Sequence, residues 1–412
     1  MCRGPIGYLD CGGKRGYNGH LVRPAKSVLG CFCLGLVLAL SAQELQHEVR
    51  VLNIEVPVRV FKGGAFIDDL KLEDFELYED GVLQKIESVF LIKKTSVERE
   101  EGRREDQPKV QRTFVFLFQM TDYMPEIERA LDYFFQSVLS AGDSLIVITP
   151  VKTYNLRNDV LDKMPRDKIK DQLAGILRSD IVLGGTEYRN LIRELEESAP
   201  TTPEALLYYS ELLDRLESLR AIDQEKLQEF SKFLGAQEGQ KHVYLFYQKE
   251  TIPKLHPRVR IELDSMNQEQ TSFVMDLIEV FEHFRREISF DVDLIKKHFS
   301  DSSLAVHLLY ITKTPALSTA MTRLNPSGMV MAEKAEDIFS AFREVARATG
   351  GLTESAADAA TAFRKAAVAT ENYYLLYYKP SDDRADGRFR EIEVKVKRDG
   401  AAVSHRAGYF AD

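Results

Sequence analysis

Four short apolar runs, separated by stretches with helical periodicity, constrain the fold more than any other feature of this sequence. The runs are TFVFLF (113–118), SLIVIT (144–149), HVYLFY (242–247) and LAVHLLYI (304–311). Runs without a polar face predict strands that are covered on both sides, which is typical of parallel sheets flanked by helices. Residues 113–371 are therefore predicted to form an α/β domain with a mostly parallel sheet.

Strand patterns without helical periodicity lie on either side of this domain. Residues 43–95 contain VRVLNIEVPVRVF and the hairpin signal Asp80-Gly81, and residues 372–412 contain YYLLYY and RFREIEVKVKRDG. Because neither end has enough strands to close a core alone, we expect the two ends to pair into one β-sandwich-like module. Residues 96–112 mix charges of both signs and are predicted to be a linker.

The first 42 residues have the features of an export signal. Arg23 and Lys26 precede an apolar run over residues 27–40, and Ala39 and Ala42 provide small side chains for cleavage. The run is short for a membrane span, so we expect an exported protein, periplasmic or extracellular, with no integral membrane segment after cleavage. An uncleaved anchor is the alternative. Residues 1–21 lack signal character, and our hypothesis is that they over-extend the true start of the protein.

Charge and cysteine content exclude several classes of function. The chain has 55 Lys and Arg against 64 Asp and Glu, a net charge of −9, which argues against binding a nucleic acid backbone. All four cysteines lie within residues 1–42, so the exported chain would have no disulfide and no thiol nucleophile. The sequence contains no His-Glu-x-x-His, Gly-x-Ser-x-Gly or P-loop motif, and we therefore do not expect an enzyme.

Three stretches carry a resemblance to a known family. They are VPVRVF…LKLEDFELYEDGVLQKIESVF (56–90), GGTEY (184–188) and ATGGL…NYYLLYYKP…HRAGYF (348–410). Through them the chain resembles the bacterial VWFA-related domain proteins over nearly the whole length of the exported chain. The resemblance implies a von Willebrand factor A-like, Rossmann-type domain. Such domains often hold Mg²⁺ or Mn²⁺ at the C-terminal edge of the sheet.

The resemblance also implies positions for a metal-ion-dependent adhesion site, at which most of the family's ligands are replaced. The family pattern is Asp-x-Ser-x-Ser, a later Thr and a later Asp. It falls here on Gln119, Thr121, Tyr123, Thr186 and Gln248. Because no carboxylate remains at these positions and neutral oxygens compete poorly with the hydration of Mg²⁺, we expect a degenerate site without a metal or other cofactor.

A shifted acidic site is the alternative that the sequence leaves open. Asp122, Glu187 and Glu250 lie close to the degenerate positions in the same three loops and would supply carboxylates to Mg²⁺. Lys249 lies in the same region and would supply a cation in place of a metal. The acidic loop SDDRADG (381–387) lacks the frame of a Ca²⁺ loop and is predicted to be a solvated hairpin.

These observations predict an exported binding protein that contacts an unidentified protein partner through the loops at the strand ends. A structural subunit of an envelope assembly is one alternative, and a hydrolase or transferase with the shifted acidic site is another. A deep pocket with a perturbed carboxylate at the strand ends would favour the enzyme. An open face there would favour the binding protein, and a large exposed apolar patch elsewhere would favour the structural subunit.

Overall fold

The computed structural model describes residues 7–8, 53–102, 108–261, 268–284, 290–312, 328–334, 336–382 and 384–411. Of residues 1–42, which contain the predicted export signal and the four cysteines, the structure describes only the short strand β1 (Gly7–Tyr8). β1 pairs antiparallel with β10 at one edge of the central sheet. The described residues form a mixed α/β protein, which confirms the class predicted from the sequence.

The central sheet has the strand order β1-β10-β9-β8-β11-β13-β15. Besides β1, its strands are β8 (Arg112–Gln119), β9 (Ser144–Ile148), β10 (Thr153–Leu156), β11 (Gln240–Gln248), β13 (Leu304–Ile311) and β15 (Thr353–Ala356). β9, β8, β11, β13 and β15 run parallel, while β10 and β1 add antiparallel pairs at one edge. The sheet is therefore of mixed type, and the four apolar runs form four of its parallel strands.

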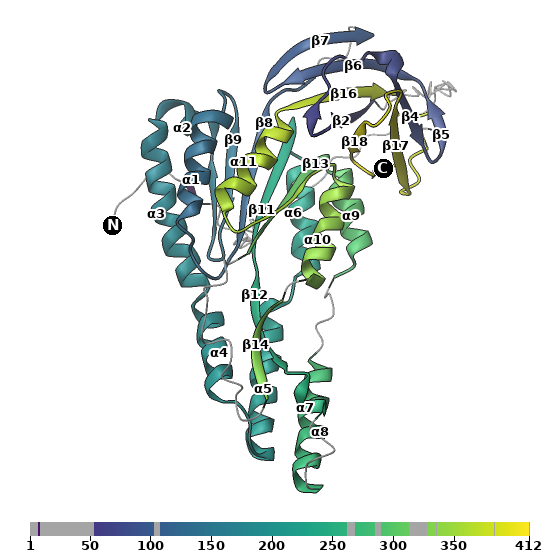
Figure 1. The fold of residues 1–412 in the computed structure, drawn as a ribbon. Helices are drawn as coiled ribbons and strands as arrows, with labels where there is room; N and C mark the ends of the chain where they lie inside the picture. The colour runs from purple at the N-terminus through teal and green to yellow at the C-terminus, as the bar shows by residue number, and fades with distance from the viewer. Residues whose placement is uncertain are drawn as a thin grey trace, which may run out of the picture.

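Helices cover both faces of this sheet, which explains why its strands are apolar on both sides (Figure 1). One face packs against α1 (Glu126–Tyr133), η2 (Phe134–Val138), α2 (Asn158–Lys163), α3 (Arg166–Gly184) and α11 (Ala359–Thr370). The other face packs against α6 (Gln224–Gly235), α9 (Val292–Asp301) and α10 (Glu336–Ala348). The first face is rich in aromatic rings, including Phe116, Phe134 and Phe363, whose rings meet edge to face.

A group of helices and a two-stranded ribbon extend away from the sheet and are called the helical arm here (Figure 1). The arm consists of α4 (Thr186–Glu197), α5 (Pro203–Arg220), β12 (Glu250–Leu255), α7 (Arg258–Ile261), α8 (Gln268–His283) and β14 (Met329–Lys334). β12 follows β11 almost directly and pairs antiparallel with β14. A small separate core that includes Leu195, Tyr209 and Leu216 holds α4 and α5 together.

Strands from both ends of the chain form a β module of two facing sheets, with the orders β18-β2-β16-β6-β7 and β19-β17-β4-β5. Their bounds are β2 (Ile54–Lys62), β3 (Ala65–Phe66), η1 (Leu72–Asp74), β4 (Phe75–Glu79), β5 (Val82–Gln84), β6 (Ile86–Lys93), β7 (Ser96–Gly102), β16 (Asn372–Tyr378), β17 (Phe389–Val396), β18 (Ala402–His405) and β19 (Gly408–Phe410). β16 lies between β2 and β6, and β17 pairs with β4. Residues 96–102, assigned above to the linker, form the charged edge strand β7.

Two buried arginines join the β module to the α/β part. Arg59 on β2 donates from Nη1 to the carbonyl oxygen of Gly350 at 3.1 Å, and Arg406 donates from Nη1 to the hydroxyl of Ser303 at 2.5 Å. Both side chains are nearly inaccessible to solvent, and burial lowers the pKa of each guanidinium. The two guanidinium groups therefore link the β module to the α/β part through one buried and one partly buried hydrogen bond.

Candidate functional site

The degenerate adhesion-site positions lie where the adjacent parallel strands β8 and β11 end at the same edge of the sheet. Gln119 is the last residue of β8 and is exposed, whereas Gln248 is the last residue of β11 and is 2% exposed. The Oε1 atom of Gln248 accepts hydrogen bonds from the backbone N–H groups of Thr121 (3.1 Å) and Asp122 (3.0 Å). The Gln248 amide therefore fixes the loop after β8 from within the protein.

A guanidinium group links this loop to the junction between α3 and α4. Arg189, near the start of α4, donates from Nη1 to the carbonyl oxygen of Thr121 and from Nη2 to the carbonyl oxygen of Val182. Its Nη2 also lies 3.2 Å from the Thr186 hydroxyl, and its Nη1 lies 3.9 Å from Oδ1 of Asp122. Arg189 thus supplies a positive charge beside the positions at which the resemblance implies a metal.

Sequence reasoning proposed Lys249 for this cationic role and missed Arg189. The Nζ atom of Lys249 instead lies 5.9 Å from the centre of the Tyr310 ring. The available signal was the spacing in GGTEYR: Arg189 follows Thr186 by three residues, which places the two side chains on one face of a helix. No sequence pattern indicated the contact between Arg189 and Thr121, because it joins distant parts of the chain.

The second glycine of GGTEY is needed for this arrangement. A Cβ atom on Gly185 would lie 2.1 Å from the carbonyl oxygen of Thr121 and 2.4 Å from Nη1 of Arg189. Both distances are far inside van der Waals contact, and the carbonyl belongs to a backbone that Gln248 already holds. The glycine is therefore present because the α3–α4 junction and the loop after β8 approach too closely for a side chain.

The hydroxyl groups of Tyr123 and Thr186 are bonded away from a shared centre. The Tyr123 hydroxyl donates to Oε1 of Glu128 at 3.0 Å, and the Arg178 guanidinium lies 5.3 Å from the Tyr123 ring centre. Partial burial, followed by the bond to Glu128, raises the pKa of Tyr123 to about 12, so the phenol stays protonated at neutral pH. The Thr186 hydroxyl donates to the Val182 carbonyl at 2.8 Å.

The carboxylates of the shifted acidic site are not brought together. Glu250 forms a buried ion pair with Arg220 and accepts a hydrogen bond from the Tyr247 hydroxyl at 2.8 Å. Asp122 lies beside Arg189, and Glu187 is exposed on α4. In the part of the chain that the structure describes, no three His, Cys, Asp or Glu side chains are placed to hold a metal ion.

A mostly apolar cavity of about 400 Å³ opens beside Gln119, on the face of the central sheet that α6 and α10 cover. It lies between the ends of β8, β9 and β11 and the helices α6 and α10. Its apolar lining consists of Leu117, Ile148, Ala221, Ile222, Leu227, Phe230, Leu245, Tyr247, Ile338 and Phe342. Two ion pairs, Arg220 with Glu250 and Lys226 with Asp223, also line it. A cavity of this size and character suits an apolar side chain of a bound protein better than a charged group.

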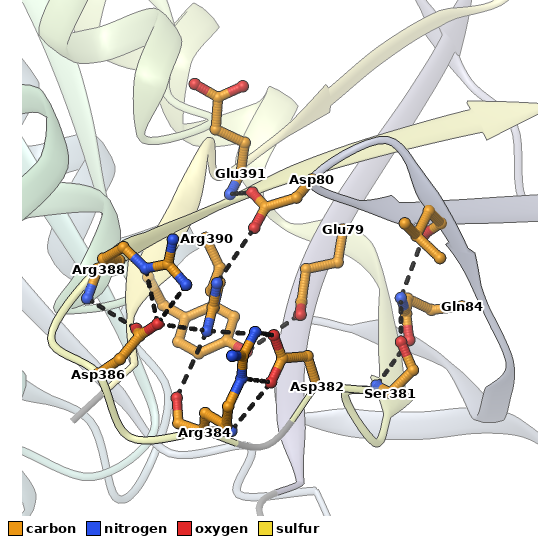
Figure 2. Close-up of polar contacts among 12 residues, drawn as sticks. Glu79, Asp80, Gln84, Ser381, Asp382, Arg384, Asp386, Arg388, Arg390 and Glu391 are labelled. Carbon is orange, nitrogen blue, oxygen red and sulfur yellow. Dashed lines mark hydrogen bonds and ion pairs between the residues drawn. The ribbon is translucent and has the colours of Figure 1, made fainter.

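The acidic loop SDDRADG is exposed to solvent as predicted, but it is not a hairpin, because it connects β16 and β17, which belong to different sheets. Its aspartates contact arginines, as Figure 2 shows. Arg384 contacts Asp382 at 2.6 Å, and Nη2 of the nearly buried Arg390 lies 3.2 Å from Asp386 and 3.6 Å from Asp382. Nη1 of Arg390 lies 3.5 Å from Asp80 in the turn between β4 and β5. This network ties the loop to the opposite end of the chain, and the Arg384 guanidinium lowers the pKa of Asp382.

The central sheet also contains a buried histidine pair that the sequence did not predict. His242 on β11 and His307 on β13 are fully enclosed, with 3.4 Å between Nδ1 of His242 and Nε2 of His307. The backbone N–H of Leu352 donates to Nδ1 of His307, so His307 carries its proton on Nε2. Burial, with the nearby positive charge of Arg59, lowers the pKa of both rings well below the ordinary value of 6.5.

Comparison with known proteins identifies no family for this chain. No family model matches it, and no curated protein matches it. Among solved structures, the crystal structure of the human COPII-coat protein Sec24c matches 74% of this chain with a TM-score of 0.32 and 8% identity. This chain spans 44% of the length of that one, and at this TM-score the likeness carries no argument. No helix within the described residues is long and apolar enough to cross a membrane.

Proposed function

We propose that this protein is an exported, VWFA-related binding protein that contacts a protein partner through the strand-end loops without a metal ion. The observation that carries this proposal is the position of Arg189. Its guanidinium joins the loops that contain Thr121 and Thr186, two of the degenerate positions. A fixed positive charge there opposes a divalent cation and at the same time holds the loops in one arrangement.

The surface around this link has the character of a protein interface. Tyr123 is half-buried beside Arg178, and aromatic and arginine side chains are enriched at the centres of protein interfaces. Gln119 is exposed at the mouth of the apolar cavity, which would take an apolar side chain of the partner. Both features lie at the C-terminal edge of the central sheet, where α/β proteins commonly bind ligands.

The shifted-site enzyme has less support, because its one buried carboxylate, Glu250, is neutralised by Arg220. A structural subunit remains a second candidate, and one observation favours it: the helical arm exposes large apolar side chains. Leu207 on α5 is 73% exposed and Met275 on α8 is 53% exposed.

Calorimetry with metal ions tests the role of Arg189. The exported protein should show no heat of binding with millimolar Mg²⁺, Mn²⁺ or Ca²⁺. Changing Gln119→Asp, Tyr123→Ser and Gln248→Asp together should create affinity only when Arg189→Met is added, because the guanidinium otherwise occupies the charge-binding region. Arg193→Met, an exposed change on the same helix, is the matched control. Binding by the unmodified protein that Asp122→Ala abolishes would replace this proposal with the shifted acidic site.

Site-directed crosslinking tests the binding surface. A photoreactive residue at position 123 should crosslink one protein from the native envelope fraction, and a chelator should leave that product unchanged. The same residue at position 229, exposed on α6, is the control and should give no such product. Equal products from both positions, or a product that disappears with the chelator, would contradict the proposed surface.

A further inference from the structure

The helical arm contains a groove that is separate from the strand-end site. It lies between α5 and α8 and encloses about 600 Å³. Its floor is apolar and is formed by Leu206, Leu213, Val280 and Phe284. Leu207, at the edge of the groove, is 73% exposed, which is unusual for a leucine without a partner surface. The two helices thus present an apolar channel of the kind that accepts a third helix.

The rim of the groove is acidic over the residues that the structure describes. Five exposed carboxylates line it, from both helices: Glu204, Asp214, Glu217, Asp276 and Glu279. Within the described residues no ion pair joins any of these carboxylates to a Lys or Arg, and His283 is the basic side chain in the lining. Such a rim attracts cations and repels an acidic partner.

We propose that this groove binds a basic amphipathic helix of a partner protein. Apolar side chains spaced i, i+3 or i+4, and i+7 would fill the channel, and flanking Lys and Arg residues would pair with the rim carboxylates. The stretch of α5 from Glu204 to Glu217 spans about 20 Å at 1.5 Å per residue, so a partner helix of about 14 residues covers the groove. This binding surface does not depend on the strand-end loops.

Fluorescence anisotropy with labelled peptides tests the proposal on the full exported protein. The probe is an 18-residue amphipathic helix of Leu and Lys. Its controls are a scrambled peptide of the same composition and an amphipathic helix of Leu and Glu. The Leu/Lys helix should bind, more weakly at high salt, and neither control should bind.

Charge-reversal variants locate the site. Glu217→Lys with Asp276→Lys should weaken binding of the Leu/Lys helix about tenfold or more, since each reversal removes an attraction and adds a repulsion. Glu225→Lys with Glu229→Lys, on α6 and outside the groove, makes the same change in net charge and should weaken binding less than about twofold. Circular dichroism checks that each variant is folded.

A second variant tests the apolar edge of the groove and leaves the buried core unchanged. Leu207→Ser alters a side chain that is already exposed, and it should weaken peptide binding at least about threefold. Equal losses in the two charge-reversal variants, or equal binding of the scrambled peptide, would reduce the interaction to general attraction by an acidic protein and would overturn the proposal. Tyr123→Ala should leave peptide binding unchanged, which separates this site from the strand-end surface.

Discussion

The buried histidine pair should make the protein sensitive to acid by an amount that follows from its environment. His242 and His307 lie inside the central sheet, and burial is the main cause that lowers the pKa of each ring. The charges of Arg59 and Arg112 act in the same direction on His242. The folded protein therefore keeps both rings neutral at pH values at which the unfolded chain protonates them.

The sign and size of the effect follow from proton linkage. Above pH 6.5 both states hold neutral histidines, so the pair leaves the free energy of unfolding independent of pH. Below pH 6.5 the unfolded state binds protons that the folded state does not, and each histidine then lowers the free energy of unfolding by about 1.4 kcal/mol per pH unit. At pH 5 the loss is about 2 kcal/mol for each ring and about 4 kcal/mol for the pair.

Urea unfolding at pH 7.5 and pH 5.0 measures this loss. In a variant with His242→Gln and His307→Gln, the difference in the free energy of unfolding between the two pH values should be smaller by about 4 kcal/mol. The amide oxygen of Gln can still accept the hydrogen bond from the Leu352 N–H. His283→Gln, an exposed change, should leave the difference as it is in the unmodified protein. An unchanged pH difference in the double variant would refute the reasoning.

Three further expectations concern stability. Gly185→Ala should lower the free energy of unfolding by about 2 kcal/mol, because the new Cβ meets a backbone carbonyl at 2.1 Å. Gly175→Ala, in an open part of α3, should raise it by about 0.5–1 kcal/mol; a similar loss in both variants would contradict the steric explanation. Arg59→Met should raise the free energy of unfolding in urea by about 1 kcal/mol, because its buried Nε has no hydrogen-bond partner; a clear loss of stability would show that the single bond from Nη1 outweighs the burial of the charge. Arg390→Met should lower the melting temperature more than Lys395→Met on the same strand, because it removes the nearly buried cation that contacts Asp80, Asp382 and Asp386 and joins the loop to the β4–β5 turn; equal effects in calorimetry would contradict a stabilising network.

Local chemistry alone predicted the features that depend on short stretches of the chain. The four apolar runs became buried strands, because a run without a polar face is stable only where both sides are covered. The Asp80-Gly81 pair forms the turn between β4 and β5, with positive φ angles of 47° and 78°. Such angles suit Asp and Gly, so the turn could be recognised from the two residue types.

The candidate site could be located from the sequence only in outline. Gln119 and Gln248 follow apolar runs, and parallel strands place their carboxyl ends at one edge, so their neighbourhood was foreseeable. The hydrogen bond that the Thr121 N–H donates to Gln248 and the one that the Thr121 carbonyl accepts from Arg189 were not foreseeable, because they join residues 127 and 68 positions apart. No periodicity or motif in either segment specifies which distant side chain will meet it.

The sequence by itself thus determined the four buried strands of the central sheet and the Asp80-Gly81 turn, but not β7, β12 or β14, because steric preference and the burial of apolar faces act over a few residues. Only the tertiary structure decided that β16 lies between β2 and β6, and that Arg189 contacts the loop after β8. Those contacts are long-range: they join residues that are far apart in the sequence and meet only in the folded chain. Their stability comes from burying surfaces and satisfying backbone groups that the sequence separates by tens to hundreds of residues.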